Sequence, residues 1–255
     1  MEPEKQYYSG TSGLVLPVPN KLYFPEQYKN KSRLTYYGSL FNSIEINSSF
    51  YKVPKPLTVE KWAAGVPADF KFTFKLHRAF THQKALQFDP GELSKFIKTI
   101  SFVGDKKGCL LIQLPPGTKI NCQDQLKRLL IAIIKLNEIN PWRLVIEFRD
   151  PSWYTDEIYQ LVGDLGVSIV MHDMPKSFTP ALSTAQNIMY VRFHGPAGDY
   201  RGSYATVFLQ SFASNICRWL QEGKLIYLYF NNTIGGAVHD LINVNRMVAE
   251  EFVEY

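Results

Sequence analysis

Short apolar segments typical of β-strands alternate along the chain with longer segments of helical periodicity, and this alternation most limits the fold. The strand segments cover residues 8–12, 43–47, 72–76, 109–114, 144–148, 168–171, 189–194 and 225–231. The helical segments between them cover residues 32–41, 58–64, 91–103, 123–137, 156–165, 206–222 and 237–251. Parallel strands joined by helical crossovers produce such a pattern.

Eight strand units with nothing left over predict an α/β fold, and specifically a single closed (β/α)8 barrel of the TIM type spanning residues 1–255. An open, doubly wound sheet is the alternative. The connection after the sixth strand, residues 173–187, lacks a helical pattern, and we expect it to be irregular.

The composition is that of a folded protein outside the membrane. Of 255 residues, 45% are hydrophobic and 20% are charged, which excludes a disordered, collagen-like or coiled-coil chain. The longest apolar runs have six residues, whereas a membrane-spanning helix needs about 20. The first ten residues lack the layout of a signal peptide. Three cysteines without metal-binding spacing predict free thiols and a cytoplasmic location.

Polar and charged side chains share one face of five expected strands, near the C-terminal end of each. Residues two apart on a strand point the same way, so Ile44 and Ile46 face the helices while Glu45 faces the barrel interior. Barrel enzymes build their active sites at this end of the strands. The expected inward-facing set is Glu45, Asn47, Lys75, His77, Glu147, Arg149, Arg192, His194 and Asn231, with Asp173 following the sixth strand.

This set contains three carboxylates and three Lys or Arg side chains, so it permits two interpretations. Mutual pairing would make a neutral ion network with a purely structural role, because unpaired buried charges are costly. A purely structural filling could consist of Val, Leu and Ile, whose burial avoids the desolvation cost of charged side chains. We therefore favour an active site. In that case Glu147 faces a solvated pocket at the open end of its strand.

A glycine-rich loop, HGPAGDYRGSY, follows the seventh strand at residues 194–204. The loops after strands seven and eight of such barrels frequently bind phosphate with backbone N–H groups and a helix start. Arg192 and Arg201 are suited to an anion, and Tyr200, Asn231 and Asn232 belong to the same region. A turn-rich loop with a surface arginine is the alternative. A divalent metal on Glu45, Glu147, Asp173 and His194 is a weaker alternative, because Arg149 and Arg192 compete for the carboxylates.

Several segments resemble the YecE-like family, also called domain of unknown function 72. The matching segments are GTSG at 10–13, FNSIEINSSFY at 41–51, Lys75, QLPP at 113–116, EFRDPSW at 147–153, YVRFH at 190–194, YRG at 200–202 and YFNN at 229–232. The resemblance implies a TIM-like fold and no assigned activity. This chain departs from the family at Leu14, where relatives usually have Trp, and at Thr233, where they usually have Asp.

Together these features predict an enzyme acting on a phosphate-bearing or sugar-like substrate by acid/base chemistry, without a cofactor. Glu45, Glu147 and His194 are the candidate catalytic residues. The candidate substrate-binding residues are Asn47, Lys75, Gln113, Arg149, Asp173, Arg192, Tyr200, Arg201, Asn231 and Asn232. The alternative is a non-catalytic barrel that binds an anionic ligand or nucleic acid, although a net charge of +5 is weak support for nucleic acid.

Overall fold

The structure is a computed structural model that describes residues 6–138, 141–180 and 186–253. Its strands are β1 (Tyr7–Thr11), β2 (Ser43–Ile46), β3 (Lys71–Lys75), β4 (Lys107–Gln113), β5 (Arg143–Glu147), β6 (Ser168–Ile169), β7 (Met171–His172), β8 (Ile188–Phe193) and β9 (Leu225–Phe230). Its α-helices are α1 (Arg33–Leu40), α2 (Pro56–Ala64), α3 (Arg78–Thr81), α4 (Pro90–Ile100), α5 (Gln123–Leu136), α6 (Asp156–Asp164), α7 (Thr206–Gln221) and α8 (Ala237–Val253).

Every expected strand segment forms a strand, and only the sixth differs, because it is split into β6 and β7. The expected helices correspond to α1, α2 and α4 to α8, while the single turn α3 was not expected. Cap residues explain several helix starts: Ser32 accepts a hydrogen bond from the Thr35 amide, and Asp89 accepts one from the Glu92 amide.

All strand pairs are parallel, and they form two sheets. One sheet has the order β1-β9-β8-β7 and the other has the order β2-β3-β4-β5-β6. The sheets approach each other where Ser12 bridges Glu45, and where the chain passes through Val170 from β6 to β7. The protein therefore has an α/β fold with parallel sheets, and the predicted closed barrel is not confirmed.

Along the edge of β1 that faces β2, side chains rather than the backbone of β2 accept hydrogen bonds from the amides of β1. The Ser9 amide donates to Asn42 Oδ1 at 2.9 Å, and the Thr11 amide donates to the Tyr37 hydroxyl at 2.7 Å. These bonds satisfy amides that a neighbouring strand would otherwise bind. The two sheets consequently meet here through one bridge rather than through a continuous ladder.

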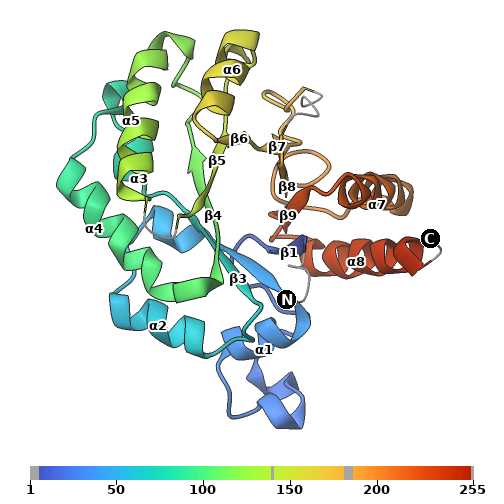
Figure 1. Ribbon diagram of the computed structural model, residues 1–255. Coiled ribbons are helices and arrows are strands. Elements are labelled where there is room, and N and C mark those ends of the chain that lie inside the picture. Colours follow the sequence, from blue (N-terminus) through green and yellow to red (C-terminus); the bar gives the residue numbers. More distant parts are fainter. Residues whose placement is uncertain (1–5, 139–140, 181–185, 254–255) are drawn as a thin grey trace.

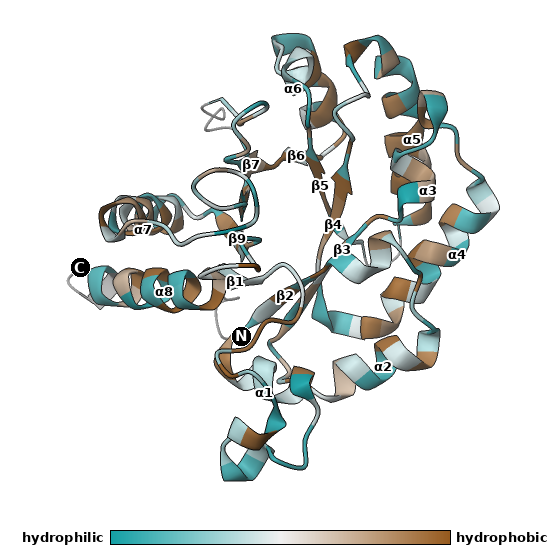
Figure 2. Cartoon of the chain, turned by 180° about the vertical axis from the view of Figure 1, so that it is seen from behind, coloured by the Kyte–Doolittle hydropathy of each residue, from teal (hydrophilic) through white to brown (hydrophobic). Residues whose placement is uncertain are grey.

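The helices cover the outer faces of the sheets, with α7 and α8 side by side next to β8, β9 and β1 (Figure 1). Strands β4 and β5 are drawn mainly in the hydrophobic colour (Figure 2). Residues such as Ile44, Phe74 and Leu228 join the buried core between strands and helices, as the alternation of side chains along each strand predicts.

A second, smaller cluster fills the space between the two sheets. It contains four tyrosines, and the rings of Tyr8 and Tyr227 stack with their centroids 5.1 Å apart. Tyr190 lies against Tyr229 at 5.3 Å. This aromatic layer lies below the strand ends and provides a packed floor for the charged residues above it.

The connection after β7 contains no helix in its described residues 173–180 and 186–187, as expected, while residues 181–185 lie outside the described part. Without a covering helix, an apolar cavity of about 400 Å³ lies over the outer face of β7 and β8. It is lined by Phe178, Phe193, Phe208 and Phe212 among others. Among the described residues, none of the helices combines the length and the apolar composition that crossing a membrane requires.

Candidate functional site

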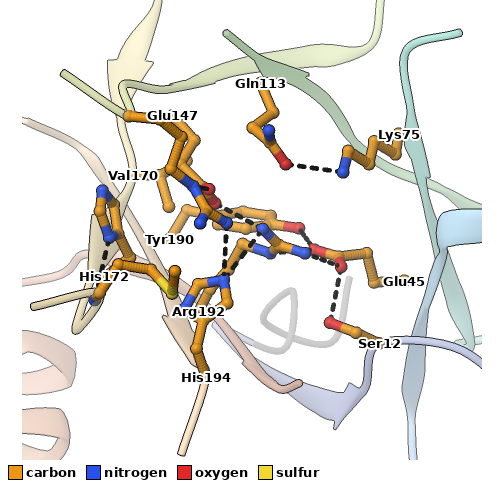
Figure 3. Close-up of polar contacts among 12 residues, drawn as sticks. Ser12, Glu45, Lys75, Gln113, Glu147, Val170, His172, Tyr190, Arg192 and His194 are labelled. Atoms are coloured by element: carbon orange, nitrogen blue, oxygen red, sulfur yellow. Dashed lines mark hydrogen bonds and ion pairs between the residues drawn. The ribbon is translucent and has the colours of Figure 1, made fainter. Parts of the chain in front are cut away.

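Arg192 of β8 is the centre of a buried ion network at the C-terminal ends of the strands (Figure 3). Its Nε donates to Glu45 Oε2 at 2.9 Å and its Nη2 donates to Glu45 Oε1 at 2.8 Å. Its Nη1 donates to Glu147 Oε2 at 2.6 Å. Such paired bonds between a guanidinium and a carboxylate are strong and directional. All three donor groups of Arg192 are therefore engaged with protein carboxylates.

Glu147 lies between two arginines and is inaccessible to solvent. Its Oε2 accepts from Arg192, and its Oε1 accepts a very short hydrogen bond from Arg149 Nε. The expectation that Glu147 faces a solvated pocket is wrong. The Glu147 carboxylate is enclosed because Arg149, two residues farther along the chain, folds back over it.

The electrostatics keep both glutamates ionised. Burial alone would raise the pKa of Glu45, but the charge and hydrogen bonds of Arg192 outweigh it and lower the pKa. Burial would likewise raise the pKa of Glu147, and the charges of Arg149 and Arg192 hold that pKa well below its usual value. Fixed carboxylates of this kind hold cations in place and are poor proton donors.

His194 is held as a neutral imidazole with a defined tautomer. Arg149 Nη2 lies 2.9 Å from His194 Nε2, so the arginine donates and Nε2 accepts. The proton is then on Nδ1, which lies 3.1 Å from Asp173 Oδ1. Burial lowers the pKa of His194 to about 4, although the hydrogen bond to Asp173 opposes this. Asp173 in turn accepts a very short hydrogen bond from the Tyr204 hydroxyl.

Lys75 lies at the end of β3, beside the network (Figure 3). Its Nζ donates to Gln113 Oε1 at 2.6 Å and lies 4.2 Å from the centre of the Phe50 ring. Burial lowers the pKa of Lys75 to about 8, and the positive charge of Arg192 adds to this effect. Lys75 and Gln113 are both half-buried, so this side of the site has access to solvent.

The structure brings Glu45, Glu147, Arg149, Arg192, His194 and Asp173 into direct contact, with Lys75 and Gln113 beside them. Asn47 follows β2, and its Oδ1 is buried without a hydrogen-bond partner among the residues that the structure describes. Asn231 is also buried, and its backbone amide donates to the Phe193 carbonyl oxygen at 2.7 Å.

The glycine-rich loop after β8 is tied to the start of α8 by hydrogen bonds within the protein. Asn232 Nδ2 donates to Asp240 Oδ2 at 2.8 Å and to the Gly202 carbonyl oxygen at 3.0 Å. The Gly236 amide, just before α8, also donates to that carbonyl at 2.8 Å. Asp240 is fully buried and accepts from Ser203 as well. The start of α8 therefore binds the protein's own loop and carboxylate.

Tyr200 and Arg201 lie on that loop and are exposed. The Tyr200 ring packs edge-on against His194, with the centroids 5.7 Å apart. The Arg201 amide donates to Asp199 Oδ1 at 3.2 Å. Tyr200 thus adjoins the ion network, whereas no contact between the Arg201 side chain and the network is found within the described residues.

Sequence reasoning missed four residues that complete the site. Ser12 donates to Glu45 Oε1 at 2.6 Å, and the Tyr190 hydroxyl donates to Glu45 Oε2 at 2.5 Å. The alternation of side chains along the strand places Tyr190 on the same face as Arg192, so its contact with Glu45 could be predicted from the sequence. Ser12, Tyr204 and Asp240 come from loops and a helix start, whose positions strand periodicity does not specify.

Metal binding has little support in this arrangement. In the described part of the chain, no group of three or more His, Cys, Asp or Glu side chains has the geometry to hold a metal ion. Arginines instead occupy the carboxylates of Glu45 and Glu147. An arginine bound to a carboxylate competes directly with any cation for the same oxygens.

Comparison with known proteins identifies the family. The family model described as "Protein of unknown function DUF72" matches residues 8–254, nearly the whole chain. The chain belongs to the DUF72 family. This confirms the resemblance that the sequence motifs indicated.

Two relatives and two solved structures agree with this assignment. The chain is 25% identical to UPF0759 protein YunF of Bacillus subtilis in an alignment 264 positions long that covers 91% of each protein. It is 33% identical to UPF0759 protein YecE of Escherichia coli K12 over 79 residues, 31% of this chain and 29% of that one. A DUF72 protein of Thermotoga maritima superposes with a TM-score of 0.72 at 22% identity, covering 95% and 98% of the two chains. One of Enterococcus faecalis superposes with a TM-score of 0.73 at 20% identity, covering 86% and 88%.

Proposed function

We propose that the protein is an enzyme that binds a phosphate-bearing, sugar-like substrate at the C-terminal ends of its strands and moves protons on that substrate. The observation that carries the proposal is that Lys75 and His194 lie at the same ion network, Lys75 with only neutral contacts and His194 with its tautomer fixed by Asp173. Lys75, with a pKa lowered to about 8, is mostly a charged proton donor, and His194, with a pKa lowered to about 4, is a neutral acceptor. A pair of groups whose pKa values are displaced in this way suits general acid/base catalysis.

The remaining charged residues hold this pair in place. Glu45 and Glu147 fix Arg192 and Arg149, and Asp173 fixes the His194 tautomer that leaves Nε2 as the acceptor. Within the described residues, Arg149 and Arg192 donate to Nε2, at 2.9 Å and 3.3 Å. An anionic substrate that draws Arg149 toward itself would remove the shorter of these two hydrogen bonds and make Nε2 a better proton acceptor.

Substrate recognition divides between cations and neutral polar groups. Lys75 is half-buried at the end of β3 and is suited to a phosphate group, and the charge of Arg149 lies near it, although the Arg149 side chain is only 7% exposed. The buried Asn47 Oδ1 has no hydrogen-bond partner in the described part of the chain, which costs free energy that a substrate hydroxyl reaching it would recover. This combination of a cationic subsite and a spare acceptor favours a phosphorylated sugar over an apolar ligand.

In this proposal the two sheets act together as one barrel, and the strand ends form its mouth. The three cysteines, Cys109, Cys122 and Cys217, are free thiols, which supports a reducing cytoplasm as the location.

Inorganic phosphate is the first test. At pH 7 and a hundredfold excess over the dissociation constant, it should stabilise the wild-type protein by about 2.7 kcal/mol in thermal or denaturant melts. The gain should be small in Lys75→Met and undiminished in Lys127→Met, since Lys127 is exposed on α5. Equal stabilisation of both variants, or none of the wild type, would reject the phosphate site.

Turnover is tested with a panel of sugar phosphates followed by NMR. A proton-transfer enzyme exchanges substrate C–H protons for deuterium in D2O, and Lys75→Met should lose that exchange. The alternative, a non-catalytic barrel for an anionic ligand or nucleic acid, is favoured by one observation, that both Glu147 oxygens are already bound to arginines. Phosphate binding without exchange on any sugar phosphate would select that alternative.

A further inference from the structure

Lys75 differs from the other cations of the site in having only neutral contacts. Its Nζ donates to the Gln113 side-chain oxygen at 2.6 Å, and the face of Phe50 lies 4.2 Å away. Within the described residues, no carboxylate lies within ion-pair distance of it, whereas Arg149 and Arg192 both form ion pairs. The amine is therefore positioned by a neutral hydrogen bond and by packing.

The surroundings of Lys75 favour the uncharged amine. Burial and the nearby Arg192 charge lower its pKa to about 8. About one Lys75 side chain in ten is then neutral at pH 7, compared with fewer than one in a thousand for an ordinary lysine. A lysine desolvated beside another cation is an activated nucleophile toward carbonyl carbon.

We infer that Lys75 forms an imine with the carbonyl group of an anionic sugar derivative, an aldehyde or ketone that carries phosphate. The inference rests on the proposed function, because it assigns the reactive group of that substrate. The inference also extends the proposed function, since Lys75 then forms a covalent bond to the substrate and does more than exchange a proton with it.

The reaction balances without a cofactor. The neutral Nζ attacks the carbonyl carbon and forms the C–N bond, and the proton that nitrogen loses goes to the former carbonyl oxygen. A second proton from solvent lets that oxygen leave as water, and a protonated imine remains. Addition of water reverses these steps and restores the lysine and the carbonyl compound.

The positive charge of the imine gives His194 a defined task. It withdraws electrons from the neighbouring carbon, so a C–H bond there becomes acidic. His194 is the neutral base of the site. The hydrogen bond from its Nδ1 to Asp173 keeps the proton on Nδ1 and leaves Nε2 as the acceptor. Electron withdrawal at the imine and a base at the adjacent carbon together allow isomerisation or carbon–carbon bond chemistry of a sugar phosphate.

Borohydride trapping tests the inference. Sodium borohydride reduces an imine to a stable secondary amine, which mass spectrometry detects as one added substrate per chain. With glyceraldehyde 3-phosphate or dihydroxyacetone phosphate, we expect the adduct on the peptide that contains Lys75, at least about tenfold above that on Lys71. Lys71 is the matched control, because it lies at the other end of β3 and its Nζ donates to the Asp105 carbonyl oxygen.

Two variants separate the outcomes. Lys75→Arg keeps the positive charge but cannot form an imine, so it should retain phosphate-dependent stabilisation and lose the adduct. Lys71→Met should retain both. An adduct spread evenly over the lysines, or none at Lys75 while phosphate still stabilises the protein, overturns the imine and leaves the proposed function intact. Loss of phosphate stabilisation in the wild type would reject the proposed function itself.

Discussion

Arg192 holds Glu45 by two parallel hydrogen bonds of 2.9 and 2.8 Å, and neither side chain has meaningful access to solvent. An arginine so committed cannot also turn toward a substrate without breaking a buried ion pair, which is costly. Anion recognition therefore falls first to Lys75, which is half-buried and, within the described residues, forms no ion pair. Arg149, whose side chain is 7% exposed, would have to leave Glu147 to join it. This division separates the residues that hold the site together from those that meet a ligand.

Glu147→Gln should lower the free energy of unfolding by about 3–5 kcal/mol, because it leaves Arg149 and Arg192 short of a buried partner. Urea melts at pH 7 measure this change, and the m-value should stay constant. Glu60→Gln, on the exposed surface of α2, is the control and should change stability by less than about 0.5 kcal/mol. A cost for Glu147→Gln of about 1 kcal/mol or less would mean that Glu147 is solvated and the network open.

Lys75→Met should raise the free energy of unfolding at pH 7 by about 1 kcal/mol, because residues placed for function are often unfavourable for stability. Burial and Arg192 both disfavour the Lys75 ammonium in the folded protein. Between pH 8 and 10.5 the wild type should approach the variant, since the folded protein loses this proton before the unfolded chain does. A destabilising effect of Lys75→Met, with Lys127→Met neutral, would contradict this account.

Stability should fall as the pH decreases from about 6.5 to 4, because unfolded His194 gains a proton in this range and folded His194, with a pKa of about 4, does not. The component due to His194 amounts to about 2–3 kcal/mol. Melts of wild type and His194→Asn across this range isolate it, since the variant lacks the titrating group. Parallel pH profiles for the two proteins would show that His194 titrates normally.

Gly235→Ala should destabilise the protein by about 1–3 kcal/mol. A Cβ atom there would lie 2.4 Å from the Gly202 carbonyl oxygen, at the contact between the loops after β8 and β9. Gly163→Ala on α6 is the control, because its Cβ would meet nothing within 4 Å and the change should stabilise the helix slightly. If Gly235→Ala has no effect in denaturant melts, the two loops are not packed together as described.

Much of the site was predictable because strand periodicity determines which side chains point inward. The alternation of apolar and polar residues in their own segments places Glu45, Glu147 and Arg192 on the inward faces of their strands. The structure brings the three side chains into contact. The strand and helix order was predictable for the same reason, since each element carries its own periodicity. Only the break between β6 and β7 departs from the expected strands.

Other features depend on contacts between residues far apart in the chain, which local pattern does not encode. The side chains of Asn42 and Tyr37 interrupt the ladder between β1 and β2, and nothing in their own segments predicts this. The solvent accessibility of Glu147 depends on how Arg149 folds back over it. The contact of the glycine-rich loop with Asp240 of α8 likewise joins residues far apart in the chain, and the segment of the loop does not predict it.

The titration of Lys75 tests the central claim most directly, because both the proposed acid/base role and the imine require a lysine with a lowered pKa. Lysine labelled with 13C at Cε gives one NMR signal per side chain, and the signal missing from Lys75→Arg assigns Lys75. The account predicts that this signal titrates with a pKa of about 8, well below the value of about 10.4 for an ordinary lysine. A Lys75 pKa at or above 10.4 would contradict it.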